Sequence, residues 1–123
     1  MDHQEIKQRI GDKIIGVAGC GGLGSNCAVA LVRAGIKHLV IADFDVIDES
    51  NLNRQYFFLN QVGRKKVFDL RDNLLAIYPD VNVETYDTRL DEDNQVKIFG
   101  NCDVIVEAFD EASQKQMLIE TFL

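Results

Sequence analysis

The sequence predicts an α/β domain with a mostly parallel sheet, because strand-like and helix-like segments alternate along its 123 residues. The strand-like segments are short apolar runs rich in β-branched residues, and the helix-like segments repeat apolar residues at helical spacing. A glycine-rich turn follows the first strand. This length is that of one domain, and 46% apolar residues suffice for a core. We therefore expect one domain over residues 1–123, with helices on both faces of its sheet.

The first third of the chain predicts helix, strand, helix and strand in that order. Glu5–Ile10 is expected to form a short leading helix, and Lys13–Ala18 a strand buried on both faces. Apolar residues at helical spacing mark Leu23–Ala34, and Gly35 follows where helices often end in a left-handed residue. His38–Asp43 is a second apolar strand that ends in an acid.

The remaining chain continues the alternation after a long loop. Phe44–Tyr56 shows neither period, and loops of this length in compact domains are usually functional. A helix is predicted over Arg64–Tyr78, an edge strand over Val81–Tyr86, a short helix over Asp91–Phe99 and a strand over Asp103–Glu107.

Right-handed crossovers between parallel strands predict the sheet order 3-2-1-4. A last helix is expected over Glu111–Phe122, with no stop signal before Leu123. Because doubly wound sheets normally continue past four strands, we expect this sequence to be the N-terminal part of a longer protein.

Composition excludes several classes of protein. The net charge of -7 argues against sequence-independent binding to nucleic acid. Neither a secretory signal nor an apolar stretch of membrane-spanning length is present, so we expect a soluble, cytoplasmic chain without a membrane role. Cys20, Cys27 and Cys102 form no Cys-x-x-Cys pair, which predicts neither a disulfide framework nor a zinc knuckle.

The glycine turn gives the first indication of a ligand. Gly19, Gly21 and Gly24 fit Gly-x-Gly-x-x-Gly between a strand and a helix, as in Rossmann-like nucleotide-binding folds, and Gly22 lies within the same turn. Such glycines permit a tight turn, a close approach of phosphate and close packing of helix on strand. Unpaired N–H groups at the helix start favour an anion there. A tight turn without a ligand is the alternative.

Residues after the second strand separate the possible nucleotides. Asp43 stands where an acid accepts hydrogen bonds from ribose, which suits nicotinamide, flavin and ATP enzymes equally. Arg54 and Lys66 together could neutralise a departing pyrophosphate, and Asp110, after the fourth strand, could hold Mg²⁺. Individually they could also be a solvated loop residue, one of three adjacent helix cations and a helix N-cap.

Taken together, Gly19-x-Gly-Gly-Leu-Gly24, Asp43-Phe-Asp45 and Ser50-Asn-Leu-Asn-Arg-Gln55 resemble the ThiF/MoeB/HesA family, and most of all its short ThiF proteins. The resemblance runs from about Lys13 to the C-terminus. It implies an ATP- and Mg²⁺-dependent adenylyltransferase. In such an enzyme the C-terminal glycine carboxylate of a ThiS-like, ubiquitin-like sulfur carrier attacks the α-phosphate and pyrophosphate leaves, here in thiamine biosynthesis. A homodimer is also implied.

The resemblance further implies a role for each matching residue. Asp43 would bind the ribose, Asp110 the magnesium and Lys66 the triphosphate. The phosphates and their surroundings would be contacted by Asn51, Arg54 and Gln55. Three features depart from the family's pattern. Only Arg9 is available as the N-terminal arginine that reaches the partner subunit's nucleotide, and Glu111 stands where asparagine is common. The carrier-binding region, with any sulfur-accepting cysteine or paired-cysteine zinc site, is expected beyond Leu123, so we expect this chain alone to bind nucleotide without turnover.

Other functions remain open from the sequence. The same fold could adenylate a MoaD-like carrier or a carboxylate on tRNA. A nicotinamide-dependent oxidoreductase would explain the glycines and Asp43 but not Arg54, Lys66 and Asp110. A catalytically silent dimerisation domain would keep only the fold.

Overall fold

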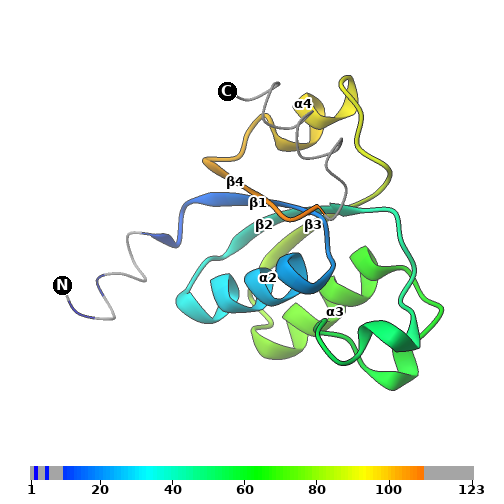
Figure 1. The fold of residues 1–123 in the computed structure, drawn as a ribbon. Helices are drawn as coiled ribbons and strands as arrows, with labels where there is room; N and C mark the ends of the chain where they lie inside the picture. Colours follow the sequence, from blue (N-terminus) through cyan, green and yellow to red (C-terminus); the bar gives the residue numbers. More distant parts are fainter. Residues whose placement is uncertain (1, 3–4, 6–9, 110–123) are drawn as a thin grey trace.

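The computed structural model describes residues 2, 5 and 10–109 of the chain (Figure 1). Most of the expected leading helix and all of the expected last helix, Glu111–Phe122, lie outside the described residues, as do Arg9 and Asp110. The described elements are, in chain order, β1 (Ile14–Ala18), α2 (Gly22–Ala34), β2 (His38–Asp43), the 3-10 turns η1 (Glu49–Asn51) and η2 (Leu59–Gln61), α3 (Lys66–Ile77), β3 (Asn82–Asp87), α4 (Asn94–Phe99) and β4 (Val104–Glu107).

The four strands form one parallel sheet in the order β3-β2-β1-β4, which confirms the predicted order. Strand β1 pairs with β2 from Ile14↔His38 onward and with β4 from Ile15↔Val104 onward. Since the strands are parallel, their carboxyl ends meet at one edge of the sheet. The glycine turn, the residues after Asp43 and the residues after Glu107 therefore lie close together.

Helices cover both faces of the sheet, as expected for a parallel sheet (Figure 1). Helices α2 and α3 pack on one face and α4 lies on the other. The larger core cluster lies under α2 and α3 and includes Val17, Ile41, Leu70 and Leu74, all less than 1% exposed. The smaller cluster, under α4, is built around Phe99. No helix in the described ranges has the length and apolar character needed to cross a bilayer.

The segment predicted as one long loop is more ordered than its composition indicated. Two backbone bonds, from Gly63 to Ile47 at 2.8 Å and from Ile47 to Arg64 at 2.8 Å, pair it with the chain before α3. These bonds hold Arg64 outside the helix, so α3 begins at Lys66 and not at Arg64. Helix α4 likewise begins later than predicted, because the carboxylate of Asp91 accepts the N–H groups of residues 93 and 94 in a preceding turn.

Candidate functional site

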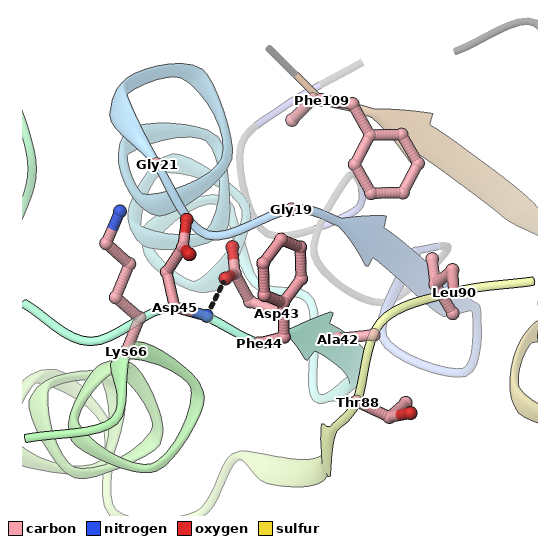
Figure 2. Close-up of a pocket in the computed structure, with 11 residues that line it drawn as sticks. Gly19, Gly21, Ala42, Asp43, Phe44, Asp45, Lys66, Thr88, Leu90 and Phe109 are labelled. Atoms are coloured by element: carbon pink, nitrogen blue, oxygen red, sulfur yellow. Dashed lines mark hydrogen bonds between the residues drawn. The ribbon is translucent and has the colours of Figure 1, made fainter. Parts of the chain in front are cut away.

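A pocket opens at the carboxyl edge of the sheet (Figure 2). Its lining comes from the glycine turn, the end of β2, the start of α3 and the segments that follow β3 and β4. The lining residues are Gly19, Gly21, Ala42, Asp43, Phe44, Asp45, Lys66, Thr88, Leu90, Ala108 and Phe109. Of the predicted site residues, Gly19, Gly21, Asp43 and Lys66 are therefore brought together in one pocket.

Two close approaches explain the first and third glycines of the turn. Gly19 has a φ of 102°, and a Cβ there would lie 2.8 Å from the carbonyl oxygen of Ala108. A Cβ on Gly24 would overlap the carbonyl oxygen of Gly19. The turn therefore folds back on the start of α2 and against the end of β4, which is the close packing expected of a third glycine.

Within the described part of the chain, no side chain caps the start of α2. Gly21 is its N-cap, no side chain of the helix caps its N–H groups, and its first turn contains no acid. Gly22 does not line the pocket, because the aliphatic stem of Arg54 lies beside it, 3.8 Å from where a Cβ would stand. The uncapped N–H groups and the helix dipole favour an anion at this end of the pocket.

Asp43 connects β2 to the glycine turn. One carboxylate oxygen accepts the N–H of Cys20 at 2.6 Å, and the other accepts the N–H of Asp45 at 2.8 Å (Figure 2 shows the second bond). The carboxylate still lines the pocket. A carboxylate has about four lone-pair sites, so two of them stay available to a ligand.

Lys66 is a buried cation that faces the pocket. Only 6% of its surface is exposed, and Figure 2 shows its side chain extending from the start of α3 toward the glycine turn. Among the described residues its Nζ forms neither a hydrogen bond nor an ion pair. Its neighbours in sequence are more exposed, with side chains 61% accessible at Arg64 and 44% at Lys65. Burying an unpaired ammonium is unfavourable, so this position indicates that the pocket takes an anion.

The segment with Asn51, Arg54 and Gln55 lies beside the glycine turn but outside the pocket lining. The Nδ2 group of Asn26 on α2 donates to the carbonyl of Arg54 at 2.7 Å, and the hydroxyl of Ser25 accepts the backbone N–H of the residue after Gln55 at 3.0 Å. The segment is therefore fixed to the first turns of α2.

Each of these three side chains has a different environment. Asn51 accepts the N–H of Asp48 at 2.9 Å and so helps to cap η1. A hydrogen bond from the backbone N–H of Ser50 lowers the pKa of the Asp48 carboxyl. Arg54 is exposed and donates to Ser50 and Asn53 at 3.2 Å, two long contacts that it can exchange for phosphate oxygens. Gln55 is buried, and its Oε1 accepts no hydrogen bond from the described residues.

Comparison with known proteins assigns the family. The sequence matches the ThiF family over residues 3–122. This chain belongs to the ThiF family.

Its relatives carry names of adenylyltransferases. A probable molybdopterin-synthase adenylyltransferase of Porphyra purpurea is 32% identical over 97% of the chain, and the chain spans 31% of that protein. The probable adenylyltransferase/sulfurtransferase MoeZ of Mycobacterium tuberculosis is 35% identical over 91% of the chain and is covered to 29%. The chain thus spans about a third of the length of these curated relatives.

Solved structures show the same fold with nucleotides. The Escherichia coli tRNA N6-threonylcarbamoyladenosine dehydratase TcdA, solved in complexes with AMP and with ATP, superposes with a TM-score of 0.89 at 30% identity. The alignment covers 94% of this chain and 48% of the TcdA chain in the AMP complex.

In this ThiF-family chain the far side of the pocket is apolar, which the sequence analysis did not foresee. Figure 2 shows Phe44, Leu90 and Phe109 on the side away from Lys66. The guanidinium of Arg89 lies over the ring of Phe44, 5.0 Å from the ring centre. The rule that ligands bind at the carboxyl ends of parallel strands pointed to these positions, but no motif marks them.

The cysteines near the pocket are not suited to nucleophilic chemistry. Cys20 is buried beneath the turn, and burial, together with the nearby Asp43 carboxylate, raises the pKa of its thiol well above the usual value. Burial also raises the pKa of Cys27. Neither thiol is therefore a ready thiolate at neutral pH.

Proposed function

We propose that this chain contains the ATP-binding part of an adenylyltransferase, and that its pocket holds ATP for attack by a carboxylate. The observation that carries the proposal is Lys66, a buried cation without a partner among the described residues, aimed at a glycine turn whose helix start is uncapped. The family assignment and the nucleotides in the TcdA structures support ATP over a nicotinamide cofactor.

Three regions of the pocket suit the three parts of ATP. The phosphates lie on the turn at Gly19 and Gly21 and are neutralised by Lys66. The free lone pairs of Asp43 accept the ribose hydroxyls. The base fits the apolar side of the pocket, which is formed by Phe44, Leu90 and Phe109.

Adenylation requires little chemistry from the protein itself. A carboxylate oxygen of the substrate attacks the α-phosphorus, an acyl-adenylate forms, and the bond to the bridging oxygen breaks as pyrophosphate leaves with its electron pair. Lys66, and Arg54 once it releases Ser50, stabilise the charge on the departing pyrophosphate. Asn51 and Gln55 support the segment that carries Arg54. Catalysis is then mostly positioning and electrostatic stabilisation.

The donor set at the pocket suits Mg²⁺. Proteins usually hold this ion through one or two carboxylates plus substrate phosphates, and the carboxylates of Asp43 and Asp45 line the pocket beside the phosphate region. Asp110, the residue we propose as the main ligand, directly follows Phe109 of the lining and lies outside the described residues. When bound, the ion would withdraw charge from the phosphate oxygens.

We propose that the carboxylate belongs to the C-terminal glycine of a ubiquitin-like sulfur carrier, specifically a ThiS-like carrier in thiamine biosynthesis, and that the protein acts as a homodimer in the cytoplasm. The names of the relatives support the carrier class, because they include a molybdopterin-synthase adenylyltransferase and MoeZ. The likeness to TcdA makes a tRNA-borne carboxylate the second candidate.

Pyrophosphate–ATP exchange tests this proposal. The full-length protein, of which we expect this chain to be the N-terminal part, is assayed with MgATP and, in parallel, a ThiS-like carrier, a MoaD-like carrier and tRNA. We expect exchange with the ThiS-like carrier, and exchange only with another substrate would reassign the pathway. No exchange with any of the three would contradict the proposal.

Single substitutions test the site in the same assay. Arg54→Ala and Asp110→Ala are expected to abolish exchange while the circular dichroism spectrum stays unchanged. Lys97→Ala, on the exposed face of α4, is the control and should exchange normally. Normal exchange in the Arg54 variant would show that the site is wrongly assigned.

A further inference from the structure

We propose that Asp43 is a positioning residue that clamps the phosphate-binding turn, in addition to any contact it makes with ribose. The inference rests on the proposed function, because it concerns the same pocket. It assigns to Asp43 a role that ribose recognition alone does not predict: the affinity for a phosphate ligand without any sugar depends on this carboxylate.

The geometry of the clamp involves both carboxylate oxygens. The bond from the Cys20 N–H, at 2.6 Å, ties the carboxylate to the middle of the glycine turn. The bond from the Asp45 N–H, at 2.8 Å, ties it to the loop after β2. Hydrogen bonds to a charged acceptor are about twice as strong as neutral ones. The first of these bonds joins residues 23 positions apart in sequence, and the second joins residues 2 positions apart.

The clamp extends to the cation of the pocket. The carbonyl of Asp45 accepts the backbone N–H of Lys66 at 3.0 Å. One continuous chain of hydrogen bonds therefore runs from the Cys20 N–H through Asp43 and Asp45 to the first residue of α3. Loss of the carboxylate releases the turn and loosens the loop on which the start of α3 rests.

The tie acts on the middle of a turn whose ends are already packed, Gly19 against Ala108 and Gly24 against Gly19. Gly19 also donates its N–H to Ala42 at 2.9 Å, whereas Gly21 and Gly22 have no side chains, and among the described residues no side chain caps the start of α2. A phosphate-binding turn works only if its N–H groups already point at the ligand, since ordering them on binding costs free energy.

Binding of inorganic tripolyphosphate separates the clamp from ribose recognition. If Asp43 only binds ribose, Asp43→Asn and Asp43→Ala remove a negative charge next to an anion and leave affinity equal or higher. If Asp43 clamps the turn, both variants bind tripolyphosphate about tenfold more weakly than the wild type by calorimetry. The two interpretations predict opposite directions.

Asp87 provides the matched control for the change of charge. It is the register partner of Asp43 on β3, and its one ion pair with a described residue is to exposed Lys65, at 3.5 Å. Asp87→Asn should leave tripolyphosphate affinity within about threefold of the wild type. Equal or tighter binding in both Asp43 variants would overturn the proposal.

A measurement on the ligand-free full chain tests the clamp directly. The Cys20 amide should exchange slowly with solvent in the wild type and in Asp87→Asn, and about tenfold faster in Asp43→Ala. Fast exchange in the wild type would overturn the clamp even if a variant fails to fold. If neither ATP nor tripolyphosphate binds the wild type, the proposed function fails, and amide exchange alone then decides the clamp.

Discussion

At the scale of single residues, the site depends on which member of a cationic run is buried. Arg64, Lys65 and Lys66 are adjacent in sequence, yet Arg64 pairs with Asp69 at 3.0 Å and Lys65 pairs with Asp87 at 3.5 Å. Of these three residues, Lys66 is the one that lines the pocket. The bond from its N–H to the chain after β2 fixes the position at which α3 begins, and thereby the direction of this side chain.

Replacing Lys66 by methionine should separate stability from binding. Methionine has a similar length and no charge. Lys66→Met therefore removes the cost of burying an ammonium that has no ion-pair partner among the described residues, and should leave the unfolding midpoint equal or higher. Affinity for MgATP should fall about 100-fold, because the anion loses a buried partner. Lys65→Met is the control and should keep its affinity within about threefold. A stable Lys66→Met protein with unchanged affinity would exclude this residue from the site.

Asp69 makes the stability of the chain depend on pH. Its side chain is 1% exposed, and this burial raises the pKa of its carboxyl. The charge of Asp72 also raises the pKa, whereas Arg64, at 3.0 Å, and Arg71 lower it without cancelling the effect of burial. A carboxyl with a higher pKa in the folded state binds more protons when folded. The stability it supports is therefore present below the unfolded value of 3.8 and is lost as the pH rises through the folded pKa.

Urea unfolding at several pH values tests this. The free energy of unfolding of the wild type, relative to Asp69→Asn, should decrease as the pH is raised from about 3 to 7. Asp80→Asn serves as the control, because Asp80 is exposed and is not among the groups that shift the pKa of Asp69. If the wild-type free energy of unfolding, relative to that of Asp69→Asn, instead increased with pH, the burial of this carboxyl would be contradicted.

At the scale of elements, the turn between β1 and α2 combines two requirements in a few residues. It must approach the end of β4, and it must leave the first N–H groups of α2 open. Gly19 satisfies the first requirement through its close approach to Ala108, and Gly24 allows it by leaving room for the carbonyl of Gly19. Gly21, as an N-cap without a side chain, satisfies the second.

Alanine substitutions distinguish these roles. Gly24→Ala places a Cβ against the backbone of Gly19, which cannot move without displacing the turn, and should destabilise the protein by about 3 kcal/mol. Gly22→Ala meets the flexible stem of Arg54 at 3.8 Å and its carbonyl oxygen at 4.0 Å, both ordinary contacts, and should change stability by less than about 1 kcal/mol. Thermal unfolding of the two variants measures the difference. Similar midpoints would show that the turn is not packed as described.

At the scale of the whole molecule, ligand binding should stabilise the fold selectively. The pocket joins the glycine turn and the segments after β2, β3 and β4, so a ligand there bridges parts of the chain that separate on unfolding. MgATP at about 100 times its Kd should raise the unfolding midpoint by roughly 10 °C, whereas NAD at the same concentration should not. A shift with NAD alone would contradict the proposed function.

The strand order, the helices on both faces and the family were all predictable, because they depend on local patterns: apolar periodicity, the glycine turn and the Ser50–Gln55 segment. Gly19, Gly21, Asp43 and Lys66 were also identified from the sequence and meet in the pocket. Their spacing along the chain marks the carboxyl ends of parallel strands and the helix starts next to them.

Only the tertiary structure decided what surrounds these residues. It engaged both oxygens of Asp43 with backbone N–H groups, buried Gln55, and brought Leu90 and Phe109 together as an apolar wall. None of these follows from periodicity. The Asp45 N–H bond is local, and the other features depend on contacts between segments far apart in sequence. The register of the parallel strands determines which strand ends lie next to one another. Close packing of the core then determines which groups each side chain contacts.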